Sequence, residues 1–186
     1  MKINIQKNDI EGLLVIQTEC FFDARGYFTE SYHKELFQTV VANCNFVQDN
    51  QSFSKNKGTL RGLHFQENEF AQSKLIHVTA GAIWDVAVDL RFDSASFGKY
   101  YAIELNETNK WQLFIPKGFA HGFITLQDET HVVYKVDRYY SKEYSAGIAW
   151  DDPELKISWP KITHLTLSEQ DQKWPSFENW RRKHGL

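Results

Sequence analysis

The stretch Trp84-Asp85-Val86-Ala87-Val88-Asp89-Leu90-Arg91 alternates apolar and polar side chains with a period of two. Because successive side chains of a β-strand point to opposite faces, this pattern predicts a strand with one apolar and one polar face. The polar face carries Asp85 and Asp89, and two acids are unusual on an inward-facing surface unless a pocket lies there. The stretch therefore predicts a strand beside a pocket, with both acids as candidate supports for the residues that line it.

The neighbouring segments repeat this strand-like character. Residues 75–79 form another predicted strand. Residues 100–105 and 111–115 flank a polar turn and predict a hairpin, while residues 122–126 and 131–136 flank a second polar turn and predict a second hairpin. Many short strands joined by polar turns indicate an all-β fold of the sandwich, jelly-roll or barrel type.

Helical signals are few. Residues 33–41 are predicted to form a short helix, residues 168–173 a single turn, and residues 178–184 a helical tail. The basic run Arg181-Arg182-Lys183 in that tail indicates a solvated helix end. The chain shows no repeat, low-complexity segment or linker, so residues 1–186 are predicted to form a single domain.

Composition and charge exclude several classes of protein. The formal net charge is −3 and no basic stripe is present, so a nucleic-acid partner is not expected. Residues 1–17 lack the apolar run of a signal peptide, and no stretch is long enough to span a membrane. Cys20 and Cys44 are too few for a disulfide scaffold, and as reduced thiols they favour a cytoplasmic protein.

Four residues carry the chemical groups that move a proton next to a carbonyl. His64, in the strand-like segment 60–66, is a base whose unperturbed pKa of ~6.5 leaves it largely neutral at pH 7. Lys74 offers a compact positive charge, Tyr134 a phenol and Asp171 a carboxylate. Alone, each has a structural interpretation: a packed histidine, a surface lysine, a core tyrosine and a helix cap. Their convergence is therefore a prediction about the fold.

The motifs around these residues resemble those of one family, the dTDP-4-keto-6-deoxy-glucose 3,5-epimerases (RmlC-type dTDP-4-dehydrorhamnose 3,5-epimerases), a branch of the cupin superfamily. The matching motifs are, in chain order, Asp23–Glu30, Gln48–Ser52, Leu60–Gln66, Gly81–Arg91, Ile115–Phe123, Tyr134-Lys135 and Trp150–Pro153. Any one motif is weak, but their order and spacing from about residue 9 to about residue 175 make the resemblance specific.

The resemblance implies a fold, an assembly and an activity. The fold is a double-stranded β-helix, or cupin jelly roll, with a few short helices. The assembly is a homodimer that binds a dTDP-sugar and needs no metal or other cofactor. The activity is the epimerisation of dTDP-4-keto-6-deoxy-D-glucose at carbons 3 and 5 to dTDP-4-keto-L-rhamnose. This isomerase reaction supplies dTDP-L-rhamnose for cell-surface carbohydrates such as lipopolysaccharide.

The resemblance also implies catalytic roles. His64 is the general base, held by Asp171 in a dyad, and Lys74 lies at the ketone oxygen. Tyr134 is the proton donor on the opposite face of the sugar. Hydrogens on the carbons beside a ketone are acidic only because the enolate charge is delocalised onto oxygen, where a cation stabilises it. The ketone is its own electron sink, so the reaction requires no cofactor.

Substrate contacts are implied for a further set of positions: Arg25, Glu30, Gln48, Asn50, Arg61, Lys74, His121 and Glu143. Tyr139, or Tyr140 beside it, matches the residue that stacks on thymine. One position departs from the family pattern, because the family commonly has a lysine just before the dyad aspartate and this chain has Gln170.

A metal-dependent cupin is disfavoured. Cupin metal sites typically combine a His-x-His pair, a Glu a few residues later and a further His. Here Gln66 stands two residues after His64, and His121 alone matches the later ligand. His77 and His131 lack supporting spacing and are interpreted as structural or surface residues.

Three other functions are alternatives. A mono-epimerase, acting at carbon 3 or carbon 5 only, shares the base and the acid, and the sequence does not fix the number of centres inverted. A non-catalytic sugar-binding cupin module would keep arginine and aromatic contacts without needing base, cation and phenol together. A 3,4-ketoisomerase of similar fold matches the Leu60–Gln66 and Tyr134-Lys135 motifs less well.

Overall fold

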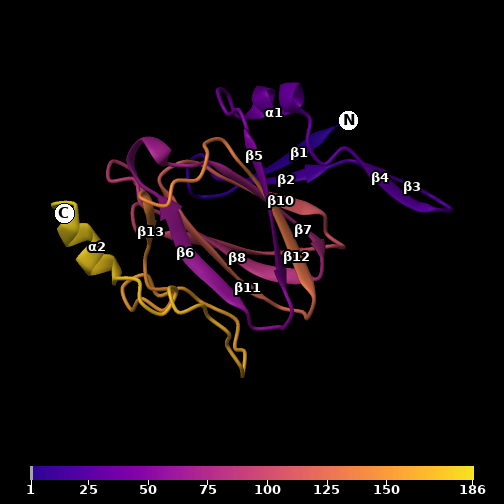
Figure 1. Cartoon of the computed structure of the whole chain (residues 1–186). Helices are drawn as coiled ribbons and strands as arrows, with labels where there is room; N and C mark the ends of the chain where they lie inside the picture. The colour runs from indigo at the N-terminus through magenta and orange to yellow at the C-terminus, as the bar shows by residue number, and fades with distance from the viewer. Residues whose placement is uncertain (1) are drawn as a thin grey trace.

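The computed structural model describes residues 2–186 and consists mainly of β-strands (Figure 1). Met1, the first residue of the predicted domain, lies outside the described residues. The strands are β1 (Ile3–Lys7), β2 (Leu14–Thr18), β3 (Cys20–Asp23), β4 (Gly26–Thr29), β5 (Gln48–Ser54), β6 (Leu60–Gln66), β7 (Lys74–Ala80), β8 (Ala82–Asp89), β9 (Tyr100–Asn106), β10 (Trp111–Ile115), β11 (Phe119–Thr125), β12 (Thr130–Val136) and β13 (Ser145–Gly147). The helices are α1 (Lys34–Val40), α2 (Phe177–Lys183) and a 3-10 turn at Asn68–Phe70. Within residues 2–186, no helix has the length and apolar character needed to cross a membrane.

Two antiparallel sheets enclose the core. The larger has six strands in the order β1-β2-β10-β7-β12-β5, and the smaller has five in the order β13-β6-β11-β8-β9. Ile76 and Leu113 of the larger sheet pack with Ile83 and Phe123 of the smaller. This arrangement confirms the predicted all-β fold, a double-stranded β-helix of the cupin jelly-roll type. The two-stranded sheet β3-β4 forms a hairpin that projects from the rest of the molecule (Figure 1).

Both predicted hairpins are wrong. Strand β9 pairs with β8 in the smaller sheet, whereas β10 pairs with β2 and β7 in the larger. Likewise β11 pairs with β6 and β8, whereas β12 pairs with β5 and β7. The polar turns at 106–109 and 127–129 therefore carry the chain from one sheet to the other. A polar turn indicates that the chain reverses direction. The next strand can bury its apolar side chains in either sheet, so the turn does not determine which strand it pairs with.

Strand β8 is buried on both faces, and its polar face is the one that points inward. Ile83 and Ala87 face the core between the sheets, and by the two-residue period Asp85 shares that face. Val86 and Val88 pack instead against the C-terminal part of the chain. The polar face thus points inward, as a nearby pocket requires, and the apolar face is covered from outside.

The C-terminal segment covers the smaller sheet by pairing with β6. Leu63 and Ile148 exchange both backbone hydrogen bonds, at 3.2 and 3.1 Å. Further on, the Leu60 N–H donates to the Thr166 carbonyl at 2.9 Å. The segment ends in α2, which confirms the predicted helical tail, and α2 buries Trp180 against the outer face of the sheet.

Helix α1 covers part of the larger sheet and confirms the predicted helix at 33–41. His33 caps its N-terminus by accepting a hydrogen bond from the Leu36 N–H at 3.5 Å. Phe37 is the buried residue of the helix and packs in a cluster with Cys44 and Phe114. Cys20 and Cys44 are both free thiols, as predicted.

Two glycines allow β6 and β11 to approach closely. A Cβ atom on Gly62 would lie 2.5 Å from the Cα atom of Gly122, and a Cβ atom on Gly122 would lie 2.9 Å from the carbonyl oxygen of Arg61. Gly62 also has a φ of 141°, which side chains other than glycine rarely adopt. This contact sets the two strands that place His64 directly opposite His121.

We predict that Gly62→Ala destabilises the protein more than Gly26→Ala. Gly26 has a similar φ of 131°, but an added Cβ there meets nothing within 4 Å. Both substitutions therefore carry the cost of a positive φ. Gly62→Ala alone also clashes with Gly122, and this clash should lower the free energy of unfolding by about a further 1–3 kcal/mol. Urea unfolding of both variants measures the difference, and equal losses of unfolding free energy would contradict the close approach.

Candidate active site

A cavity of about 430 Å³ opens between the two sheets and the C-terminal segment. Its walls bring together six of the predicted site residues, namely Arg61, His64, Lys74, His121, Tyr134 and Asp171. They come from β6, β7, β11, β12 and the loop before α2. The fold therefore supplies the convergence that the sequence could only predict.

His64 and Asp171 form a hydrogen-bonded pair between His64 Nε2 and Asp171 Oδ1. The His64 side chain is 41% exposed and the Asp171 side chain 5%, so the ring faces the open cavity while the carboxylate supports it from behind. Burial alone would raise the pKa of Asp171. The hydrogen bond and charge of His64, together with hydrogen bonds from Ser168 and Trp174, outweigh burial, so the pKa of Asp171 is lowered. Asp171 is thus held as a carboxylate, and Nδ1 is the His64 nitrogen left to take a proton.

Lys74 begins β7 and is buried beside His64. Its Nζ donates to the backbone carbonyl of His64 at 3.4 Å, and the residue is 9% exposed. Burial lowers the pKa of Lys74 to about 8, against the opposing charge of Asp85. A cation that is this poorly solvated interacts strongly with a negative charge that develops nearby.

His121 lies on β11, directly opposite His64 on β6. Its Nε2 hydrogen-bonds to Oδ1 of the fully buried Asp85 at 2.7 Å. Burial lowers the pKa of His121, although the charge and hydrogen bond of Asp85 oppose that change, so the imidazole is predominantly neutral at pH 7. Asp85 thereby supports a cavity residue, as predicted. Asp89 does not, because its carboxylate is bonded to Arg91 and to the hydroxyl groups of the loop that follows β8.

Tyr134 approaches from the opposite sheet. It lies on β12 of the larger sheet, whereas His64 and Arg61 lie on β6 of the smaller one. Burial raises the pKa of Tyr134, with the charge of Arg61 acting in the opposite direction, so the phenol stays protonated at neutral pH. Arg61 is held by the Phe53 carbonyl at 3.0 Å and the Ser54 hydroxyl at 3.3 Å.

The other predicted substrate contacts do not line this cavity. Arg25 stands at the tip of the β3-β4 hairpin, where its side chain is 90% exposed and paired with Asp23. Gln48 and Asn50 lie on the edge strand β5 and bond to each other at 2.7 Å. The remaining three are the half-buried Glu30 and the exposed Tyr139 and Glu143. Of the two candidate stacking tyrosines, Tyr140 lines the cavity.

Several residues that line the cavity were not assigned to the site from the sequence, among them Trp174, Gln66 and Gln170. Trp174 donates its indole N–H to Asp171 Oδ1 at 3.2 Å, yet an isolated tryptophan in a loop carries no pattern that would reveal this. Gln66 was noted as the last residue of a family motif and as the place where a metal-binding cupin has histidine, and Gln170 only as a departure from the family. Within residues 2–186, no three His, Cys, Asp or Glu side chains are grouped to hold a metal ion.

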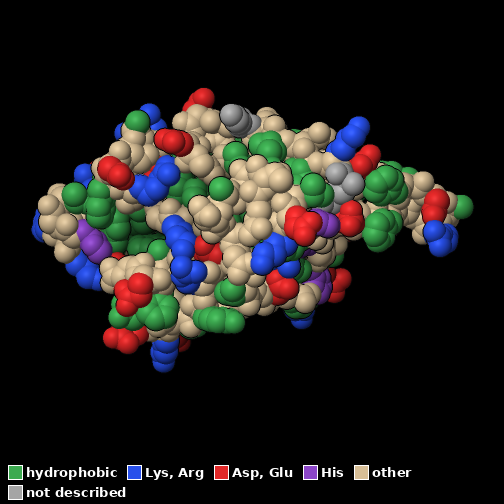
Figure 2. Space-filling view, turned by 90° about the horizontal axis from the view of Figure 1, so that it is seen from above, with side chains coloured by type: hydrophobic (Ala, Val, Ile, Leu, Met, Phe, Trp, Pro, Cys, Tyr) green, Lys and Arg blue, Asp and Glu red, His purple; other side chains and the backbone are tan. Residues whose placement is uncertain are grey.

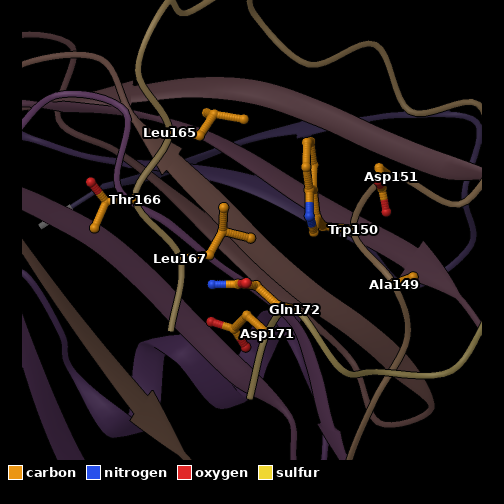
Figure 3. Close-up of a pocket in the computed structure, with 8 residues that line it drawn as sticks. All are labelled: Ala149, Trp150, Asp151, Leu165, Thr166, Leu167, Asp171 and Gln172. Atoms are coloured by element: carbon orange, nitrogen blue, oxygen red, sulfur yellow. The ribbon is translucent and has the colours of Figure 1, made fainter. Parts of the chain in front are cut away.

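A second cavity, of about 610 Å³, lies beside Asp171 (Figure 3). It is bounded by the segments 149–151 and 165–172, and Asp171 is the one predicted site residue in its wall. A carboxylate without a base or a cation beside it cannot carry out the proton transfer considered above. The first cavity therefore carries the candidate active site.

Comparisons with known proteins identify the family of this chain. Residues 7–179 match the family model described as dTDP-4-dehydrorhamnose 3,5-epimerase. The dTDP-4-dehydrorhamnose 3,5-epimerase of Sinorhizobium fredii is 47% identical over 171 residues, which cover 92% of this chain and 88% of that protein.

Solved structures extend the similarity to three dimensions. The dTDP-4-dehydrorhamnose 3,5-epimerase of Bacillus anthracis, with TDP and PPi bound, is 46% identical with a TM-score of 0.92, covering 95% of this chain and 100% of that one. The enzyme of Legionella pneumophila, in complex with dTDP-4-keto-L-rhamnose, is 39% identical with a TM-score of 0.92, covering 95% and 94%. Sequence and fold agree over nearly the whole chain, which belongs to the dTDP-4-dehydrorhamnose 3,5-epimerase family.

Proposed function

We propose that this chain converts dTDP-4-keto-6-deoxy-D-glucose to dTDP-4-keto-L-rhamnose by inverting carbons 3 and 5. The observation that carries the proposal is the placement of two proton-transfer groups on opposite walls of one cavity. His64, backed by Asp171, comes from the smaller sheet, and Tyr134 comes from the larger. Inversion of a carbon centre needs a base on one face of the sugar and an acid on the other.

Each step uses a residue suited to it. His64 removes the hydrogen beside the ketone, and Asp171 stabilises the imidazolium that forms. The electron pair of the broken C–H bond moves onto the ketone oxygen, where Lys74 meets the negative charge. Tyr134 then donates its proton to the opposite face of the same carbon, and solvent restores the protonation of both residues. Repetition at the second carbon completes the conversion.

The pKa shifts support these assignments. A raised pKa keeps Tyr134 in the protonated form that a donor requires. The pKa of about 8 for Lys74 leaves the amine mostly charged at neutral pH. The proposed aromatic platform for thymine is Tyr140, because its ring lines the same cavity, and Arg61 and His121 complete the nearby polar contacts.

We further propose a homodimer in which each hairpin reaches the cavity of the partner subunit. Phe21, Phe22, Tyr27 and Phe28 on the projecting hairpin are 50%, 76%, 50% and 65% exposed. Figure 2 shows hydrophobic side chains and a charged tip on this projection, at the right of the view. A two-stranded sheet is marginal in water and so much exposed aromatic surface favours an interface. Arg25 at the tip, too far out for its own cavity, would then contact the partner's substrate.

We also propose that residues 1–186 form one domain and that the enzyme acts in the cytoplasm. The shared core of the two sheets supports the first proposal, and the two free thiols support the second. Cell fractionation with an antibody to the protein tests the location, and an enzyme recovered with exported proteins would overturn it.

The assay that tests the proposed function follows the sugar by NMR in deuterated water. Wild-type enzyme is expected to exchange the hydrogens on carbons 3 and 5 and to release the L-sugar. His64→Ala should lose exchange and inversion together by about 10²–10⁴-fold, because the base is gone. Tyr134→Phe should retain exchange and lose inversion, because the enolate still forms but its acid is missing.

The assay also separates the alternative functions. Exchange at a single carbon identifies a mono-epimerase, and binding without any exchange identifies a sugar-binding module. Equal losses of exchange and inversion in a folded Tyr134→Phe variant would remove Tyr134 from the role of final acid.

Lys74 should determine the alkaline side of the pH profile. Because burial lowers its pKa to about 8, the cation disappears as the pH rises through that value, and kcat/KM is expected to fall. Lys74→Ala should reduce turnover about 10²–10³-fold and remove this dependence, with little change in the affinity for dTDP. If kcat/KM of Lys74→Ala falls with rising pH as it does in the wild type, the titrating group is not Lys74.

Subunit mixing tests the hairpin proposal. The Arg25→Ala and His64→Ala variants are each expected to have low activity on their own. In a dimer of one subunit of each, one cavity would combine an intact His64 with an intact Arg25 from the other subunit. Random exchange makes half of the dimers mixed, so turnover should rise to about one quarter of the wild-type value. If Arg25 acts within its own subunit, mixing restores nothing.

A further inference from the structure

The five residues after β12, residues 137–141, form an irregular segment at the edge of the active-site cavity. Its Tyr139 and Tyr140 are 68% and 57% exposed, and Tyr140 lines the cavity. An exposed loop of this kind is mobile unless polar contacts hold its backbone. The contacts that hold it therefore determine where the Tyr140 ring stands before a ligand arrives.

Gln66 makes the most complete of these contacts. Its side-chain oxygen accepts the Ser141 N–H at 2.7 Å, and its side-chain nitrogen donates to the Ser141 carbonyl at 3.0 Å. Both ends of one amide thus bind both backbone groups of one residue, and Gln66 itself is 7% exposed. Gln66 lies two residues after His64 on β6, so the two side chains share one face of the strand.

Single hydrogen bonds hold the rest of the segment. Gln72 donates to the Arg138 carbonyl at 2.8 Å, and Gln48 accepts the Tyr140 N–H at 3.3 Å. At the start of the segment, the buried Asp137 accepts the Ser73 N–H at 2.7 Å. Each of these side chains makes one hydrogen bond to a backbone group, whereas Gln66 makes two. Gln66 is therefore the side chain with the most hydrogen bonds to the backbone next to Tyr140.

We propose that Gln66 is a positioning residue that fixes residues 139–141 so that the Tyr140 ring is preorganised for the flat base of the nucleotide. This inference rests on the proposed function and adds to it a residue that contributes affinity through the loop. Holding the loop in its bound form removes an ordering cost from binding, so affinity for the nucleotide rises. No step at the sugar is assigned to Gln66, because both ends of its amide bind Ser141.

The chemical demand on residue 66 is specific. Only a side chain that donates and accepts can satisfy the Ser141 N–H and carbonyl together. Glutamate keeps the acceptor and loses the donor, and methionine, of similar size, loses both. The expected order of nucleotide affinity is therefore wild type, then Gln66→Glu, then Gln66→Met.

The test measures the dissociation constant for dTDP by calorimetry, together with kcat at saturating substrate. Gln66→Met should weaken dTDP binding about tenfold and raise KM in parallel, while kcat changes by less than about twofold. The matched control is Gln112→Met, because Gln112 is also a buried glutamine and donates to the Ser31 carbonyl at 2.8 Å in a different part of the fold. Gln112→Met should lower stability and leave dTDP affinity unchanged.

A double-mutant comparison shows whether Gln66 acts through the tyrosine. In a Tyr140→Ala background, Gln66→Met should add little further loss of affinity, because the ring that it positions is already gone. Full additivity of the two losses, an unchanged dissociation constant in Gln66→Met, or a fall in kcat with KM unaltered would each overturn the inference. A wild-type protein that does not bind dTDP would instead overturn the proposed function.

Discussion

The structure depends on one constraint, which is that the smaller sheet is buried on both of its faces. The inner face of β8 meets the core between the sheets, and its outer residues Val86 and Val88 need a cover of their own. The C-terminal segment supplies that cover by pairing with β6 through Ile148 and Thr166. The same pairing directs the loop before α2 to the mouth of the cavity, where Asp171 meets His64. The same segment therefore buries apolar surface and completes the His64–Asp171 pair.

The cavity also retains charge that the fold alone does not need. Lys74, Asp85 and His121 are buried together, and Asp85 Oδ2 has no protein partner among the described residues. Buried ionic groups are weak contributors to stability, because desolvation offsets their mutual attraction. Their value lies in the electrostatic environment, since groups fixed in a poorly solvated site stabilise an enolate oxygen without having to reorganise.

Sequence patterns predicted the strands more reliably than their partners. The two-residue period identified β8 and placed Asp85 on a face near a pocket, because alternation is a local property of extended backbone. The pairing of β9 with β8 and of β10 with β2 and β7 is not local, and identical polar turns serve both hairpins and sheet crossings. Asp171 was paired with His64 through the family resemblance alone, and Gln66 was noted as the last residue of a family motif and as a missing metal ligand. Its two bonds to Ser141 join residues 75 positions apart, which no spacing rule connects.

The His64–Asp171 pair spans 107 positions of the chain, and this separation has a consequence for biosynthesis. A nascent polypeptide that has passed β6 and even β13 carries the base without its carboxylate, and the outer face of the smaller sheet is still open to water. The cover and the His64–Asp171 pair can form only after residues 148–171 have left the ribosome, long after β6 has emerged. A chain that stops before Asp171 is therefore expected to lack the proposed dyad and to expose the apolar outer face of the smaller sheet, which is the kind of surface that chaperones and proteases recognise.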